Sequence, residues 1–71
     1  MCMAAEIRRV RRQVLGLTQR ELAAELGIES VNVSRWERGV AQPRLRHLRR
    51  LAELSDQPLD TFFRGNGKQA A

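Results

Sequence analysis

Apolar residues recur along most of the chain at the three- and four-residue spacing of amphipathic helices. No stretch sustains the alternation of apolar and polar residues that a strand requires. The first expected helix spans Ala4 to Val14, and Gly16 follows its end. Its apolar face carries Met3, Ile7, Val10 and Val14. The pattern predicts an all-α protein.

The next two expected helices are short and are separated by Gly27. The first runs from Thr18 to Leu26, and Thr18 with Glu21 has the spacing of a capping box. The second runs from about Glu29 to Arg38. The residues expected to face inward are Leu22, Ala23, Leu26, Ile28, Val33 and Trp36.

Two further helices are expected after Pro43, over Arg44 to Leu54 and over Leu59 to Phe63. The inner face of the former carries Leu45, Leu48, Leu51 and Ala52. We therefore expect a compact bundle of five short helices that forms one domain over residues 1–64. The polar, glycine-containing tail 65–71 is expected to be disordered.

The segment from Gln19 to Arg38 has the features of a helix-turn-helix motif. Ala23 is small enough to let the two helices cross closely, and Gly27 tolerates the positive φ of a tight turn. This arrangement leaves one face of the second helix free, and in DNA-binding proteins that face enters the major groove. The pattern predicts a recognition helix at about Glu29 to Glu37.

The charge of the chain supports a polyanionic partner. The 71 residues carry a net charge of +5 with a pI of about 11.3, and all of the cations except Lys68 are arginines. The planar guanidinium matches both phosphate oxygens and the edge of guanine. A basic domain of this size is typical of proteins that bind nucleic acid.

Other function classes are not favoured. Cys2 and His47 are the single cysteine and histidine, so we expect no disulfide, no metal site and no cofactor. His47 is expected at the surface. The chain shows no catalytic triad and no phosphate-binding glycine loop, so we expect no enzyme activity. No apolar run is long enough to span a membrane, and the single cysteine favours the reducing cytoplasm.

Several segments, taken in order, resemble the Cro/C1-type (Xre-like) family of helix-turn-helix proteins. They are Leu17-Thr-Gln-Arg-Glu-Leu-Ala-Ala-Glu-Leu-Gly27, Val33-Ser-Arg-Trp-Glu-Arg-Gly39, Gln42-Pro43, Leu51-Ala-Glu and Leu59-Asp-Thr-Phe-Phe63. The resemblance implies a lambda-repressor-like domain that binds duplex DNA as a homodimer and regulates transcription as a repressor, in the cytoplasm and on the nucleoid. Two positions depart from the family pattern, because Arg44 stands where Ser or Thr is usual and Asp56 where Gly is usual.

The resemblance also implies base-reading positions. Ser30, Val31 and Arg35 match them, and Glu29 and Asn32 flank them. An exposed Val31 suits a thymine methyl group, Arg35 suits the O6 and N7 atoms of guanine, and Asn32 suits adenine. Glu29 either accepts from cytosine or opposes the positive dipole of the helix N-terminus.

Phosphate contacts are implied for Gln19, at the start of the second helix, and for Arg38 and Arg44, which flank the loop after the third. Trp36 is expected to fill the core.

Glu37 matches a family glutamate that pairs with an arginine of the first helix. An ungapped match points to Arg12. Helical geometry points to Arg11, which lies on the apolar face, and this choice requires one extra residue between Val14 and Leu17. We expect Arg11.

A second function remains open at this stage: a protein-interaction module, such as an antitoxin, that uses the same fold. Leu59, Phe62 and Phe63 form either a dimer surface or the bottom of the monomer core. Phe62 is expected in the core, whereas the pattern leaves Phe63 open. No site for a small molecule is evident.

Overall fold

The computed structural model describes residues 2–63, and every regular element within them is a helix. Four α-helices are present: α1 (Met3–Arg9), α2 (Gln19–Leu26), α3 (Ser30–Glu37) and α4 (Leu45–Ser55). A π-helix, η1 (Val10–Leu15), continues α1. The expected fifth α-helix is instead a 3₁₀-helix, η2 (Leu59–Phe63). The tail 65–71, with the domain boundary expected after residue 64, lies outside the described residues.

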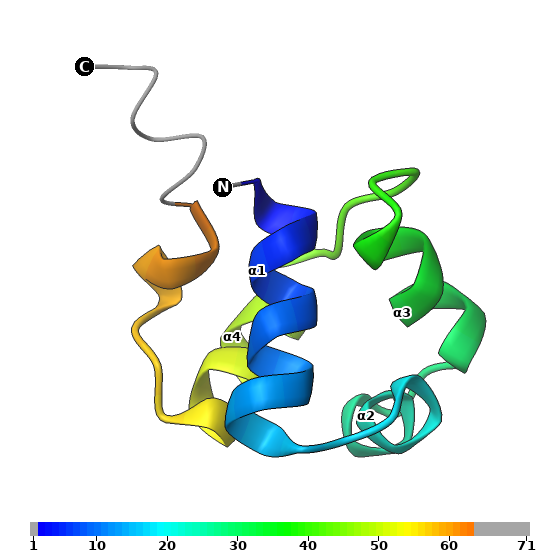
Figure 1. The fold of residues 1–71 in the computed structure, drawn as a ribbon, viewed down its shortest axis with the longest axis horizontal. Coiled ribbons are helices and arrows are strands. Elements are labelled where there is room, and N and C mark those ends of the chain that lie inside the picture. Colours follow the sequence, from blue (N-terminus) through cyan, green and yellow to red (C-terminus); the bar gives the residue numbers. More distant parts are fainter. Residues whose placement is uncertain (1, 64–71) are drawn as a thin grey trace.

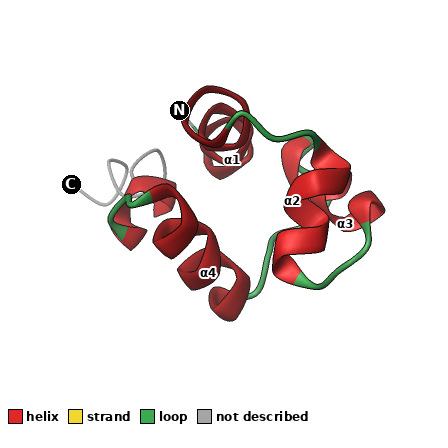
Figure 2. Ribbon diagram, turned by 90° about the horizontal axis from the view of Figure 1, so that it is seen from below, coloured by secondary structure: helices red, strands yellow, loops and turns green. Residues whose placement is uncertain are grey.

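The helices surround one apolar core. α1 runs through the middle of the view in Figure 1, with α2 and α3 on one side and η2 on the other. Seen from below, α4 lies across from α2 and α3 (Figure 2). The largest fully buried hydrophobic side chains are Phe62, Ile7, Leu22, Leu51, Val10 and Val33. Within the described part of the chain, no helix is long and apolar enough to cross a membrane.

The predicted boundaries of the second and third helices are correct to within one residue. The Thr18 side chain accepts from the Glu21 backbone, and the Glu21 carboxylate accepts from the Thr18 backbone, so the capping box is formed. Gly27 ends α2 with φ of 72°, the left-handed conformation that favours glycine. The turn therefore sends α3 across α2, against which it packs.

The end of the first helix differs from the expected α-helix. The backbone N–H of Gly16 reaches back to the carbonyl of Arg11, five residues earlier, and the N–H of Leu17 donates to the same carbonyl at 3.0 Å. A π turn of this kind accommodates one more residue than an α turn. It moves Val14, expected in the core, to a position where 41% of its surface is exposed.

Two expectations for α4 are also wrong. Leu45 was expected inside but is exposed, because it is the first residue of the helix and the buried stripe begins one turn later, at Leu48. His47 was expected at the surface but is half-buried, because its ring lies against Trp36 with ring centroids 5.6 Å apart. Asp56 ends α4 with φ of 54°, which explains why glycine suits this position in similar sequences.

Replacing Ala23 with leucine should destabilise the fold by about 1–3 kcal/mol, because the added methylenes have no space in a packed core. Ala23 lies in α2 and only 2% of its surface is exposed. Ala24, its exposed neighbour, provides the matched control. Thermal melts followed by circular dichroism should separate the two leucine variants. Equal melting temperatures would contradict close packing at Ala23.

Candidate nucleic-acid interface

Helix α3 presents a face that residues 2–63 leave open. Val33 and Trp36 are buried, whereas Val31 and Arg35 are exposed and Ser30 is half-buried. An exposed valine beside an exposed arginine, on a helix with a buried opposite side, gives a surface with both an apolar and a cationic contact. This is the surface expected from the sequence to read bases, and the roles of its residues stay predictions.

The two residues that flank this face occupy different settings. Glu29 is exposed and is the N-cap of α3, but its side chain makes no capping hydrogen bond. Asn32 is half-buried and lines a hollow of about 260 Å³ between α3 and the start of α4. Gln42, Arg44 and His47 line the same hollow. Asn32 therefore lies toward the loop before α4.

His47 has an unusual environment in this hollow. Its Nδ1 atom is buried and has no hydrogen-bond partner among the described residues. Burial lowers the pKa of the imidazole, and the positive charges of Arg46 and Arg44 lower it further. The neutral form of the ring is therefore favoured, and the ring packs on Trp36.

Two buried charges fix α3 against the first helix. The Arg11 Nε atom donates to Glu37 Oε2, and the Arg11 Nη2 atom donates to Glu37 Oε1 at 2.9 Å. Arg11 Nη1 also donates to the carbonyl of Leu17 at 2.8 Å. Arg12 is exposed and takes no part, so the pairing that an ungapped match suggested is not formed. The π turn supplies the extra residue that this register needs.

Gln19 joins the same cluster, which the sequence pattern did not predict. Its Nε2 atom donates to Glu37 Oε1 at 3.0 Å. An amide nitrogen carries two hydrogens, so one N–H of Gln19 stays available. The first backbone N–H groups of α2 also have no partner within the helix. The N-terminal end of α2 therefore carries several donors, of which Glu37 orients the side-chain amide of Gln19 and Thr18 already accepts from the backbone N–H of Glu21.

Because Glu37 can be protonated, the stability that this cluster gives to the fold depends on pH. Burial raises the pKa of its carboxyl group, but the hydrogen bonds from Arg11 and Gln19 and the charges of Arg11 and Arg8 more than offset this, so the pKa lies below the ordinary value of 4.5. A lowered folded-state pKa stabilises the fold above the unfolded-state value. Stability should therefore fall as the pH drops from about 4.5. The measurement is the urea midpoint of the wild type below pH 4.5, with Glu37→Gln as the control because its amide does not titrate. A wild-type midpoint that changes no more than that of Glu37→Gln would contradict the prediction.

Arg38 and Arg44 lie at the two ends of the loop between α3 and α4, and both are exposed. Arg44 is the N-cap of α4, and its side chain makes no capping hydrogen bond. A cation at a helix N-terminus is repelled by the positive end of the helix dipole, so binding an external anion there would stabilise the start of α4.

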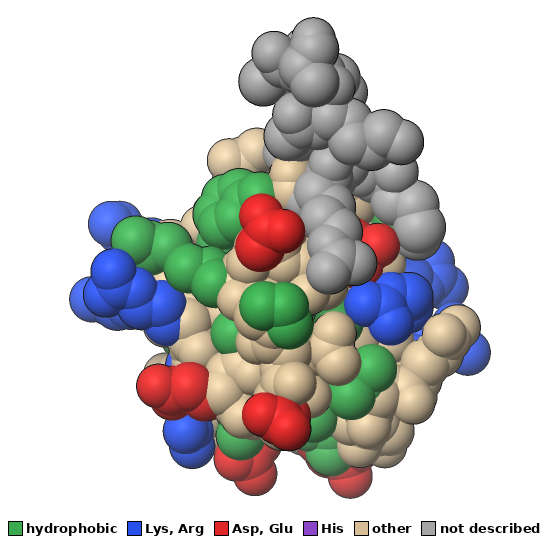
Figure 3. Space-filling view, turned by 90° about the vertical axis from the view of Figure 1, so that its left-hand side faces the viewer, with side chains coloured by type: hydrophobic (Ala, Val, Ile, Leu, Met, Phe, Trp, Pro, Cys, Tyr) green, Lys and Arg blue, Asp and Glu red, His purple; other side chains and the backbone are tan. Residues whose placement is uncertain are grey.

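The face of the molecule that carries η2 is mixed in charge. Figure 3 shows the face that carries η2, on the side away from α3. Acidic and hydrophobic side chains occupy the visible middle of this face, and the blue Lys and Arg side chains lie toward its margins. No group of His, Cys, Asp and Glu that could hold a metal ion occurs in the described ranges.

Solved structures of a repressor are similar to this chain. No curated protein sequence matches this one. The crystal structure of the P22 c2 repressor in complex with a synthetic operator is similar, with a TM-score of 0.75 and 29% identity over 87% of this chain and 92% of that one. The solution structure of the DNA-binding domain of the P22 c2 repressor gives a TM-score of 0.78 and 29% identity, covering 93% and 86% of the two chains.

The family comparison covers most of the sequence. Residues 7–62 match the helix-turn-helix family that contains the Cro/C1-type proteins. This range includes η1, α2, the Gly27 turn, α3 and α4, together with the end of α1 from Ile7 onward and most of η2. The match and the two similar structures agree with the geometry of the exposed α3 face. The chain therefore belongs to the Cro/C1-type helix-turn-helix family.

Proposed function

We propose that this protein is a transcriptional repressor that binds duplex DNA in a sequence-specific way, with α3 in the major groove. The observation that carries this proposal is the open α3 face, with Val31 and Arg35 exposed while the same helix is fixed from behind by the buried Arg11–Glu37 pair. A recognition helix needs both properties, because direct base contacts require a fixed orientation. The similarity to a repressor solved on its operator supports the same function.

Base reading is assigned to the residues of this face. Arg35 takes guanine, and Val31 contacts a thymine methyl group. Ser30 contacts a base or a phosphate. Asn32 contacts a base at the edge of the site, and its position beside the loop favours a base near that loop. Glu29 either accepts from a cytosine at the other edge or counters the positive end of the α3 dipole.

Phosphate binding is assigned to Gln19, Arg38 and Arg44. The free N–H of Gln19 and the first backbone amides of α2 suit one phosphate. The two arginines follow the DNA backbone from both ends of the loop.

The protein is further proposed to act as a homodimer, with half-sites separated by about one helical turn, or roughly 34–36 Å. Phe63, which is exposed at the end of η2, is a candidate for the contact between protomers. Because its partner is duplex DNA, we place the protein in the cytoplasm, on the nucleoid.

The proposal is tested by selecting duplexes from a random pool and measuring affinity for selected and random duplexes across a salt series. DNA binding predicts that log K falls linearly with log salt, by about 0.9 for each phosphate neutralised. Sequence-specific binding predicts enrichment of one motif. An affinity that does not depend on salt, or a pool that stays random, would exclude the proposed function.

Arg35→Ala should weaken binding to the selected duplex by about 1–3 kcal/mol and relax the preference at one base pair. The reason is that one bidentate contact to a guanine is lost while the phosphate contacts remain. Arg50→Ala, at an exposed position of α4, is the control with the same change of charge. A base-reading role is refuted if Arg35→Ala loses equal affinity for selected and random duplexes.

A further inference from the structure

Two arginines of the first helical segment, one in α1 and one in η1, form no ion pair with a described residue. Arg8 and Arg12 are exposed and four residues apart, and neither forms an ion pair. Arg9 differs, because its guanidinium donates to Glu6 at 2.9 and 3.1 Å. Arg11 is bound to Glu37. Two of the four arginines in this segment are therefore available to an external anion.

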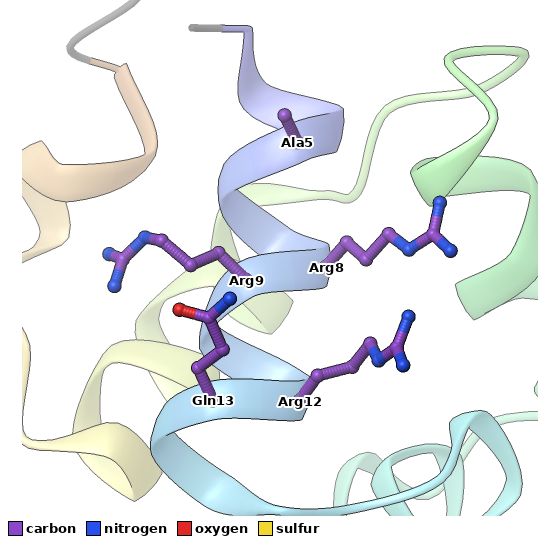
Figure 4. A pocket seen from close by; sticks show the side chains of 5 residues that line it. All are labelled: Ala5, Arg8, Arg9, Arg12 and Gln13. Carbon is purple, nitrogen blue, oxygen red and sulfur yellow. The ribbon is translucent and has the colours of Figure 1, made fainter.

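The two free arginines point toward the helix-turn-helix. In the close view of Figure 4, the side chains of Arg8 and Arg12 extend toward α3 and α2, whereas Arg9 extends to the opposite side. The positive charge of Arg8 also helps to lower the pKa of Glu37, whose Oε1 atom accepts from Gln19. Arg8 and Arg12 therefore lie on the side of α1 where the donors at the start of α2 are found.

The local chemistry favours phosphate. Like charges four residues apart on a helix repel each other, and an anion between or beside them removes this repulsion. An open hollow of about 580 Å³ lies along this surface, and no carboxylate is among the residues that line it: Ala5, Arg8, Arg9, Arg12 and Gln13. Guanidinium groups bind phosphate oxygens through paired N–H donors.

We propose that Arg8 and Arg12 form a second phosphate-binding patch, which contacts the DNA backbone beside the phosphate held at the start of α2. This inference rests on the proposed function and extends it from the helix-turn-helix to α1. The patch lengthens the footprint on one strand beyond the bases that α3 reads. Because phosphates carry no sequence information, the patch raises affinity for all duplexes alike.

The test compares two double variants that carry the same net charge, +3 instead of +5, because each replaces two arginines with glutamine. The first is Arg8→Gln with Arg12→Gln. The control is Arg9→Gln with Arg50→Gln, which removes two cations already paired with Glu6 and Glu53. Fluorescence anisotropy with a short labelled duplex of random sequence gives the slope of log K against log salt for each variant and for the wild type.

The Arg8/Arg12 variant should have a slope shallower by about 0.9 for each arginine that holds a phosphate, and its ratio of affinities for selected and random duplexes should be unchanged. The control should keep the wild-type slope. Equal slopes for the two double variants, with wild-type protein that binds DNA, would overturn the patch alone. Wild-type protein that binds no duplex would overturn the proposed function as well. Melting temperatures identify any loss of affinity that comes from unfolding.

Discussion

Glu37→Ala should lower the free energy of unfolding by about 3–5 kcal/mol, because it leaves a buried cation without its partner. The Glu37 side chain is 5% exposed and the Arg11 side chain 10% exposed, so the guanidinium left behind has little access to water. Gln19 loses its acceptor in the same step. For a domain of this size the melting temperature should fall by more than about 12 °C, measured by circular dichroism.

A matched acidic residue shows whether burial is the cause. Glu53 pairs with Arg50 at 3.5 Å, but its side chain is 70% exposed. Exposed pairs of this kind contribute at most about 1 kcal/mol, so Glu53→Ala should leave the melting temperature nearly unchanged. If the two alanine variants melt alike, the Arg11–Glu37 pair does not hold the fold as argued.

Phe62→Ala should cost about 3–5 kcal/mol, because it removes the largest fully buried side chain and leaves a cavity. Phe62 lies in η2, which packs against α1 and α4 and closes the core on the side away from α3. We expect one of two results. Either the variant is already unfolded at room temperature and shows no cooperative thermal transition, or it folds and its urea midpoint is much lower than that of the wild type.

The next residue in the chain is the control. Phe63 has the same side chain, but 37% of its surface is exposed. Phe63→Ala should therefore have a much smaller effect on the stability of the protomer. If Phe63→Ala destabilises as much as Phe62→Ala, and the loss depends on protein concentration, Phe63 lies in a contact between protomers. A Phe62→Ala protein as stable as the wild type would disprove the role of η2 in the core.

Features that depend on neighbours along the chain were predictable from the sequence. The capping box joins residues three apart, and the left-handed Gly27 ends the helix that this box begins. The inward positions of α2 and α3 follow from their helical spacing, because both helices have regular α geometry. The exposed face of α3, with Val31 and Arg35, follows from the same spacing.

Features that join distant parts of the chain needed the tertiary structure. The sequence favoured Arg11 over Arg12 as the partner of Glu37, and the structure forms that pair, but it did not predict the π turn in which Val14 is exposed. The bond from Gln19 to Glu37 spans 18 residues and has no local signal.

The sequence alone thus determined α2 and α3, the caps of α2 and the free face of the recognition helix, because short-range hydrogen bonds and periodicity specify these. Only the tertiary structure decided which charges pair, how His47 packs on Trp36, and that Arg8 and Arg12 stay unpaired beside α2. The physical reason is that the direction of a side chain depends on the rotation of its helix against its neighbours, and a single π turn changes that rotation for every residue that follows.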